Sequence, residues 1–307
     1  MTLDDACGWF DLEAEDTAEV VVAAAQIAAD VGLSSRVADV VRQLSEHFEE
    51  LKPWKLLDLP ALFDPVTEPD APPALRWLYV VAFAEFLPTT LDAHTRRGVS
   101  ATMSRATLAD VGRHVRIARR LYGVRACIEQ DWLQAHLRGL LYDLGRLQFN
   151  LARLQLGQTE LDDAAIDATP GTVVVETHIP ESGPLDPDAV DASFSRVQGF
   201  FARCYPELGT IRYATCDSWL LDPQLADIVP DSNIARFGAR YRLFRPATVS
   251  DQSALDFVFR APTTPREDLP RDTRLQRGLL DHLDRGGHIE ARYGWLEFPA
   301  FNRAADG

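Results

Sequence analysis

The hydrophobic pattern of this chain changes its period near the middle of the sequence. Up to residue 156, apolar residues recur every three or four positions, which is the spacing of one face of an α-helix. After residue 171, short β-branched and apolar runs alternate with turn-forming segments, which indicates strands mixed with helices. The 307 residues are enough for two domains of ordinary size. The sequence therefore predicts a helical first domain and a mixed α/β second domain.

Helical periodicity runs through the first part and is broken by the proline-rich stretch 60–73, which is typical of a loop. The longest predicted helix, Gln130–Leu156, contains no proline and carries leucines and aromatic residues in helical period. No strand is therefore expected before Gly157. The other predicted helices are Thr17–Asp30, closed by Gly32, a helix starting at Ser34 or Ser35, Leu75–Leu87 and Thr107–Tyr122.

The second part is expected to contain elements in the order β-α-β-β-β-α-β. The predicted strands are Thr172–Ile179, Thr210–Leu221, Arg236–Arg245, Leu255–Arg260 and His288–Phe298, and the predicted helices are Ala189–Cys204 and Thr273–Asp284.

The polar segment Gly157–Gly171 is predicted to separate the two domains. We expect residues 1–16 to form a flexible acidic N-terminus, residues 17–157 the helical domain, and residues 171–303 the mixed domain.

The charge of the chain limits its partners. The formal net charge is −15, and a field of that sign repels nucleic-acid backbones and anionic lipid surfaces. The four cysteines are scattered without a CxxC spacing, which fits a reducing compartment. The acidic start is unlike a signal peptide, and the apolar run 20–29 is too short to cross a bilayer. We therefore expect a cytoplasmic protein that binds neither nucleic acid nor membrane.

Several segments in the later part of the chain carry a family resemblance. They are Trp132–Phe149 (WLQAHLRGLLYDLGRLQF), His178–Pro184 (HIPESGP), Cys216–Pro223 (CDSWLLDP), Ser232–Ile234 and Thr273–Arg277 (TRLQR). In these segments the chain resembles a family of bacterial two-domain acyltransferase-like proteins, with a helical N-terminal domain and a GNAT-like C-terminal domain. The resemblance implies an α+β fold in which an all-helical N-terminal domain packs on a GNAT-like mixed α/β domain. It also implies acyl transfer from a thioester donor.

A GNAT-like domain implies a strand-to-helix junction that cradles the pyrophosphate of coenzyme A, since a helix N-terminus attracts anions. The predicted strand Leu255–Arg260 leads into the helix that begins at Thr273, which points to that helix as the cofactor helix. We expect Arg271, Thr273, Arg274 and Arg277 to bind acyl-CoA or an acyl-phosphopantetheine. Pairing of these arginines with Glu267, Asp268 and Asp281 is the alternative.

Two departures from the GNAT pattern weigh against this reading. The Q/R-x-x-G-x-G/A signature is absent, because Arg274 lies four residues before Gly278 and Leu280 follows. One strand follows the Thr273 helix, where a complete GNAT core has another helix and two more strands.

Two polar residues on the first strand of the second part are candidate bases. Glu176 and His178 are two residues apart, so they share a face of their strand. Either could deprotonate an amine acceptor. The alternative is that they form the polar face of an edge strand.

A second polar run, Cys216–Trp219, interrupts an apolar strand. Asp217 and Trp219 should share one face, and Cys216 and Ser218 the other. We predict a pocket in which Cys216 or Ser218 donates a proton, Asp217 assists and Trp219 contacts substrate. The alternatives are a structural hydrogen-bond network, or a nucleophile pair of Cys216 with His178.

Asn233, the His178–Glu181 spacing and an arginine group each allow two interpretations. Asn233 is expected either to line the substrate pocket or, with Ser232, to cap a turn. No metal site is expected, since Pro180 prevents a helix that would bring His178 and Glu181 together. The arginines at 113, 116, 119 and 120 form either a solvated helix face or a docking surface for an acyl carrier protein.

The function that fits these features is an N-acyltransferase that moves an acyl group from acyl-CoA or an acyl carrier protein to an amine, in a small molecule or a peptide. The rival hypothesis is a catalytically silent binding or scaffold protein that keeps the fold without the cofactor loop.

Overall fold

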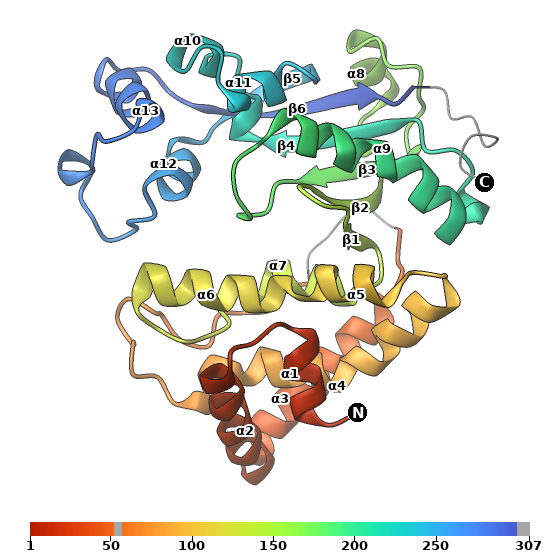
Figure 1. Ribbon diagram of the computed structural model, residues 1–307, viewed down its shortest axis with the longest axis vertical. Helices are drawn as coiled ribbons and strands as arrows, with labels where there is room; N and C mark the ends of the chain where they lie inside the picture. Colours follow the sequence, from red (N-terminus) through yellow and green to blue (C-terminus); the bar gives the residue numbers. More distant parts are fainter. Residues whose placement is uncertain (52–56, 300–307) are drawn as a thin grey trace. The chain divides into compact units, whose positions relative to one another are not determined.

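The computed structural model describes residues 1–51 and 57–299. It divides into two compact units, Met1–Asp143 and Leu144–Gly307 (Figure 1). The predicted α+β class is confirmed, since helices form the first unit and strands with helices form the second. The observed division precedes the predicted boundary segment 157–171.

The first unit is built around one long buried helix, α4. Residues on all sides of α4 are buried, including Trp77, Val80 and Phe83, because α1, α2, α3 and α7 pack against it. The helices of this unit are α1 (Leu3–Trp9), α2 (Ala14–Ala29), α3 (Val31–Glu46), α4 (Pro73–Arg96), α5 (Ala101–Leu108), α6 (Asp110–Tyr122) and α7 (Gln130–Leu137).

The prediction that residues 1–16 are flexible is wrong for most of that segment. Residues 3–9 form α1, whose Thr2 cap accepts a hydrogen bond from the Asp5 amide. Ala6 and Phe10 lie four residues apart and are both buried, so the segment is held by its apolar face. Gly32 lies inside α3, while Asp30 ends α2 and caps α3.

The predicted helix Gln130–Leu156 is also wrong. Helix α7 ends at Leu137, and a hairpin of β1 (Leu141–Asp143) and β2 (Gln148–Arg153) follows. Gly145 in its turn has φ +119°, a conformation open mainly to glycine. The leucines fit a helical period, but alternation of apolar residues with Gln148 and Asn150 is the pattern that the fold obeys.

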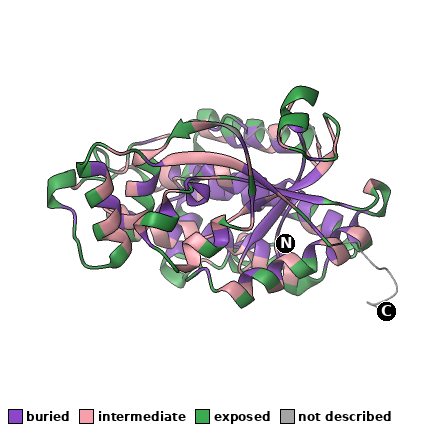
Figure 2. Ribbon diagram, turned by 90° about the horizontal axis from the view of Figure 1, so that it is seen from above, coloured by how far each residue is buried: buried purple, intermediate pink, exposed green. Residues whose placement is uncertain are grey.

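The second unit contains most of a mixed sheet. Its described strands, with β1, form the order β1-β2-β3-β4-β6-β5, and Figure 2 shows that many of their residues are buried. The remaining elements are α8 (Gln158–Asp163), β3 (Val173–His178), α9 (Pro187–Cys204), β4 (Tyr213–Ser218), α10 (Leu225–Ile228), α11 (Asn233–Gly238), β5 (Arg242–Val249), α12 (Asp251–Phe259), α13 (Arg274–Asp284) and β6 (Glu290–Glu297), with 3-10 turns at 206–208, 219–221 and 266–268.

Two predicted strands of this unit need correction. The segment Leu255–Arg260 belongs to helix α12 and its C-terminal cap. Asp251 is the first residue of this helix, and a side-chain hydrogen bond of 2.7 Å between Gln252 and Asp256 stabilises it. The segment Arg236–Arg245 is split between α11 and β5. In both places local β propensity is overridden by context.

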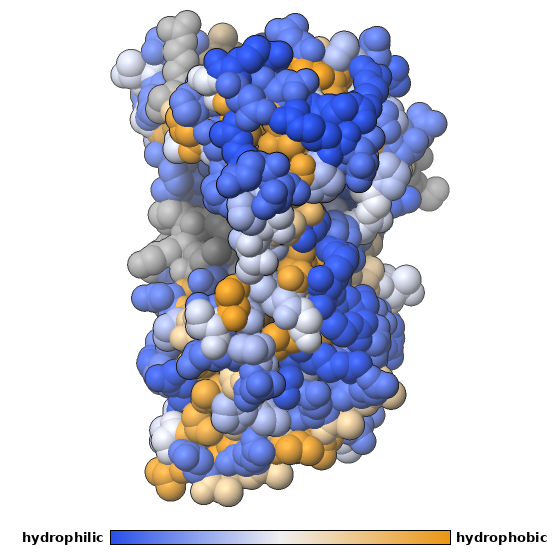
Figure 3. Space-filling view, turned by 90° about the vertical axis from the view of Figure 1, so that its left-hand side faces the viewer, coloured by the Kyte–Doolittle hydropathy of each residue, from blue (hydrophilic) through white to orange (hydrophobic). Residues whose placement is uncertain are grey.

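The face drawn in Figure 3 is largely hydrophilic, with apolar residues scattered over it. Among the described residues, no single helix has the length and apolar character needed to cross a bilayer. Only α2 and α3 taken together, bent by 109° at their junction, meet that test of length and composition.

The hairpin turn offers a test of the fold. A Cβ at Gly145 would lie 2.5 Å from Nη1 of Arg196, and its φ is positive. We predict that Gly145→Val lowers the free energy of unfolding by about 1–3 kcal/mol. The control is Gly8→Ala in α1, where a Cβ meets nothing within 4 Å. Equal urea midpoints for Gly145→Val and wild type would contradict the turn described here.

Candidate functional site

The parallel strands β3 and β4 separate before they end. In the part of the chain that the structure describes, their pairing consists of Val175 with Ala214 and Glu176 with Thr215. Both strands continue beyond these pairs, to His178 and Ser218, while each remains paired with its outer neighbour. We call the separated ends, 177–178 and 216–218, the fork. In open α/β sheets, ligands bind beyond the carboxyl ends of parallel strands, which is where the fork lies.

One face of the sheet at the fork carries a polar cluster. Glu176 and His178 share this face with Asp217, since Glu176 is in register with Thr215 and alternation places Asp217 beside it. Asn150 of β2 is in register with Glu176, and its Nδ2 donates to the Glu176 carboxylate over 3.3 Å. The structure thus brings three predicted residues together with a fourth that the sequence analysis missed.

The amide of Asn150 has a defined orientation. A carboxylate only accepts hydrogen bonds, so the amide must direct its NH2 at Glu176 and its oxygen at His178. Nε2 of His178 then donates to Oδ1 of Asn150. This chain of contacts fixes the carboxylate from one side and sets the histidine tautomer.

The environment of Glu176 suits a base. Burial raises the pKa of its carboxyl group above the ordinary value of 4.5; the Asn150 hydrogen bond opposes that rise and the nearby Asp217 charge adds to it. Surrounding protein atoms also raise the pKa of Asp217, although that residue is exposed overall. A carboxylate with a raised pKa is a stronger base than an ordinary one.

The opposite face at the fork carries Cys216 and Ser218. Cys216 is 1% exposed, and burial raises the pKa of its thiol strongly. It lies on the other face from His178, so a Cys216–His178 nucleophile pair is not formed. Ser218 accepts a hydrogen bond from the Leu220 amide over 3.1 Å and thereby starts the 3-10 turn.

The two predicted pocket residues lie in separate elements. Trp219 is buried in the turn after β4 and packs edge-on against Phe257, with ring centroids 6.2 Å apart. Asn233 is the first residue of α11, and Ser232 caps that helix by accepting from the Ala235 amide. Ser232 therefore plays the capping role that the alternative interpretation gave to this segment.

The predicted anion site around α13 has structural partners. Arg271 forms ion pairs of 2.5 Å with Asp281 and Asp284, and Arg277 donates to two backbone carbonyls. Thr273 caps α13, and Arg274 donates to the Pro230 carbonyl over 3.3 Å. The helix α13 follows helix α12 rather than a strand, so the topological reason for placing coenzyme A there is lost.

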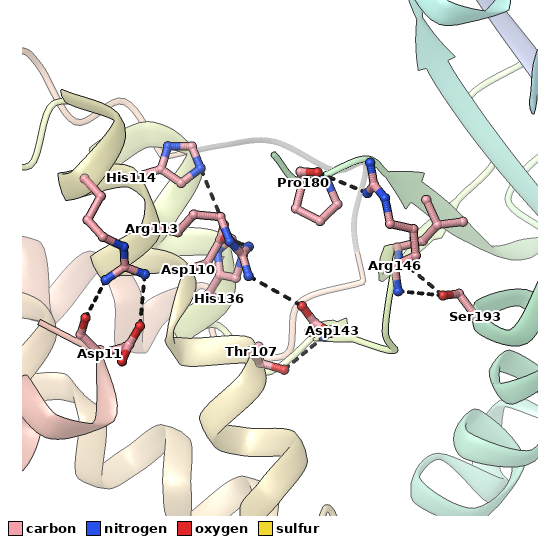
Figure 4. Close-up of polar contacts among 12 residues, drawn as sticks. Asp11, Thr107, Asp110, Arg113, His114, His136, Asp143, Arg146, Pro180 and Ser193 are labelled. Carbon is pink, nitrogen blue, oxygen red and sulfur yellow. Dashed lines mark hydrogen bonds and ion pairs between the residues drawn. The ribbon is translucent and has the colours of Figure 1, made fainter. Parts of the chain in front are cut away.

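The strand-to-helix junction of the parallel pair is instead the loop 179–186 between β3 and α9. Arg146, from the hairpin turn, donates to the carbonyl oxygens of Pro180, Gly183 and Pro184 at 3.1, 2.8 and 2.8 Å. The Arg146 amide also donates to Oγ of Ser193 over 2.8 Å (Figure 4). One arginine thus ties the loop to the sheet.

The N-terminus of α9 already holds a carboxylate. Asp186 accepts from the amides of Asp188 and Ala189 at 3.1 and 3.0 Å. The dipole at this end is therefore engaged by a fixed anion. Two arginines contact the loop: Arg146 through the loop's carbonyl oxygens, and Arg260 through an ion pair of 2.9 Å with Glu181.

The arginine face of α6 is neutralised within the first unit. Arg116 and Arg119 form ion pairs of 2.9 and 2.6 Å with Asp11 and Glu13. Arg113 contacts the buried Asp110 (Figure 4). These contacts fit the alternative of a solvated helix face. In the described residues, no group of three or more His, Cys, Asp or Glu side chains could hold a metal ion.

Sequence comparison matches both halves of the chain. A family profile for an N-acyltransferase N-terminal domain matches residues 1–139, and one for a GNAT-like C-terminal domain matches residues 141–296. The chain belongs to this two-domain N-acyltransferase family. Comparison with curated proteins gave no match.

Solved structures similar to this N-acyltransferase family member are acyltransferases. One, a mutant in complex with octanoyl-CoA, is 32% identical with a TM-score of 0.83. A second, in complex with CoA and 10C-teicoplanin, has the same identity and score. A third, in complex with decanoyl-CoA, is 33% identical with a TM-score of 0.82. Each match covers 96% of this chain and 87% of the other.

The raised pKa of Glu176 predicts a pH-dependent stability. The folded state retains the proton that the unfolded state loses, so stability falls as pH rises from about the ordinary value of 4.5 through the raised pKa. Glu176→Gln should remove this fall, and its stability relative to wild type should increase with pH. The control is Glu267→Gln, at an exposed glutamate. Urea unfolding at several pH values measures the effect; parallel curves for Glu176→Gln and wild type would contradict it.

The role of Arg146 is also testable. We predict that Arg146→Ala speeds amide hydrogen exchange in residues 179–186 by about tenfold, because three carbonyl contacts are lost. The matched control is Arg153→Ala, which loses one hydrogen bond of 2.9 Å to Gly171. Unchanged exchange in the loop would show that other contacts hold it.

Proposed function

We propose that this protein transfers an acyl group from acyl-CoA to an amino group of a small molecule, with Glu176 as the general base. The observation that carries the proposal is the polar cluster at the fork, where a carboxylate of raised pKa lies at the carboxyl ends of two separating parallel strands. Family membership and the acyl-CoA complexes of the similar acyltransferases support the same reaction.

The chemistry requires one proton acceptor beside the amine. The amine nitrogen attacks the thioester carbonyl carbon, a C–N bond forms, and the C–S bond breaks. Glu176 takes the proton that the nitrogen loses, and the sulfur leaves as thiolate and is protonated from solvent. Asn150 and His178 act as positioning residues, since they hold the carboxylate through a fixed amide.

The fork suits the thioester arm of the donor. Where the strands separate, their facing backbone N–H and C=O groups are not paired with each other, and an extended arm can pair with a strand edge. A backbone N–H there would polarise the thioester carbonyl. In this proposal the phosphates lie against the loop 179–186, which Arg146 holds in place through its three carbonyl contacts.

Coenzyme A is favoured over an acyl carrier protein as the donor. The arginines that would dock an acidic carrier are already paired with Asp11 and Glu13. For the acceptor, the similar structures with bound glycopeptide support a small molecule of that class. The net charge of −15 would attract its cationic amine.

The direct test is acyl transfer with purified protein, decanoyl-CoA and teicoplanin, followed by thiol release and the mass of the product. Glu176→Gln should lower kcat by about a hundred- to ten-thousandfold while leaving the KM for the donor within about twofold, because general-base catalysis contributes on that scale. Glu267→Gln, at an exposed glutamate, should match wild type.

Two outcomes would overturn the proposal. If Glu176→Gln keeps a kcat within threefold of wild type, Glu176 is not the base. If the wild-type protein binds decanoyl-CoA by calorimetry but acylates neither teicoplanin nor simple primary amines, the rival hypothesis of a silent binding protein is favoured.

A further inference from the structure

A small apolar pocket lies in the second unit after the carboxyl end of β4. Its volume is ≈ 260 Å³, and residues from the turn after β4, α10, α11 and β5 line it. Apolar side chains of Leu221, Leu225 and Leu243 form much of its wall. This volume is below the roughly 300–1,000 Å³ of a site for a whole drug-sized ligand, so the pocket fits a part of a larger molecule.

One residue connects this pocket to the fork. Tyr241 lines the pocket, and its hydroxyl donates to Oγ1 of Thr177 over 3.0 Å. Thr177 is the first β3 residue of the fork. Leu243 is in register with Gly294, which is in register with Cys216 of the fork, so Leu243 lies on the Cys216 face of the sheet, opposite Glu176.

The polar atoms of the pocket are already satisfied. Asp222 is the one acidic side chain in its lining, and its carboxylate accepts from the amides of Gln224 and Glu290 at 2.9 and 2.8 Å. The lining therefore gives an apolar ligand an apolar contact surface, and it gives a charged ligand no unpaired side-chain group to bind.

The helix α11 presents small residues to the pocket. Ala235, Gly238 and Ala239 are spaced by three and four positions, so they share one face of that helix. A Cβ on Gly238 would lie 3.1 Å from the Leu220 carbonyl oxygen, which leaves little room for a larger residue. Small side chains on this face keep the pocket open.

We propose that this pocket binds the alkyl tail of the acyl donor and sets the acyl chain length that the protein accepts. The proposal rests on the proposed function, because the fork is where the thioester would lie. A linear alkyl chain is the part of the donor that matches a small apolar pocket, and it would pass between the separated strands to reach the face opposite Glu176. Each methylene buried there should strengthen donor binding by about fourfold.

The test compares CoA, acetyl-CoA, octanoyl-CoA, decanoyl-CoA and dodecanoyl-CoA by calorimetry. Wild type should bind decanoyl-CoA at least tenfold more tightly than CoA. Ala235→Leu and Ala239→Leu fill the pocket, and each should bring the affinities for decanoyl-CoA and CoA to within threefold of each other. Leu243→Ala, which enlarges it, should shift the preference toward dodecanoyl-CoA. Ala25→Leu, at an exposed position of α2, is the matched control and should keep the wild-type ratio.

The pocket inference and the proposed function can be contradicted by different results. If decanoyl-CoA and CoA bind wild type equally, or if folded Ala235→Leu, Ala239→Leu and Leu243→Ala all keep the wild-type ratio, the alkyl tail lies elsewhere even when acyl transfer occurs. If the ratios change as expected but no amine is acylated, the pocket inference stands and the proposed function fails. Circular dichroism establishes which variants are folded, and Leu243→Ala supplies a test that does not depend on filling the pocket.

Discussion

The short pairing of β3 with β4 is the constraint on which the candidate site depends. Two residue pairs hold the parallel strands together, and the outer ladders keep both strands extended beyond that point. The chain thereby opens a fork without losing the sheet. Glu176 lies at the last pair, so it is rigidly held and next to the opening. A base on a loop would have neither property.

The sequence predicted the elements whose periodicity was unambiguous. The strand at 173–178, the helices α9 and α13 and the final strand β6 lie close to their predicted positions. The hairpin after α7 was missed because leucines at 133, 137, 140, 144, 147 and 151 recur at the helical spacings of three and four residues. The glycines at 139 and 145 were the signal for the turn.

The same error explains which site residues were missed. Glu176, His178 and Asp217 could be named from their own strands, and register places them together. Asn150 and Arg146 could not be named, since they had been assigned to a helix. The arginines near α13 were chosen because they flank the start of a helix that was predicted to follow a strand, and the helical state of 251–259 removes that strand. Register and side-chain pairing depend on tertiary structure, which a single sequence does not specify.

The carboxylate of Asp186 at the start of α9 has a consequence for the kinetics of donor capture. It places a fixed negative charge where related helix termini could attract phosphates, in a chain of net charge −15. A polyanionic donor approaches such a surface against long-range repulsion, while the contacts that hold it are short-range. Added salt screens the long-range repulsion more than the short-range contacts, because the Debye length shrinks to about 8 Å at physiological ionic strength. Donor association should therefore quicken as ionic strength rises, opposite to an electrostatically steered enzyme.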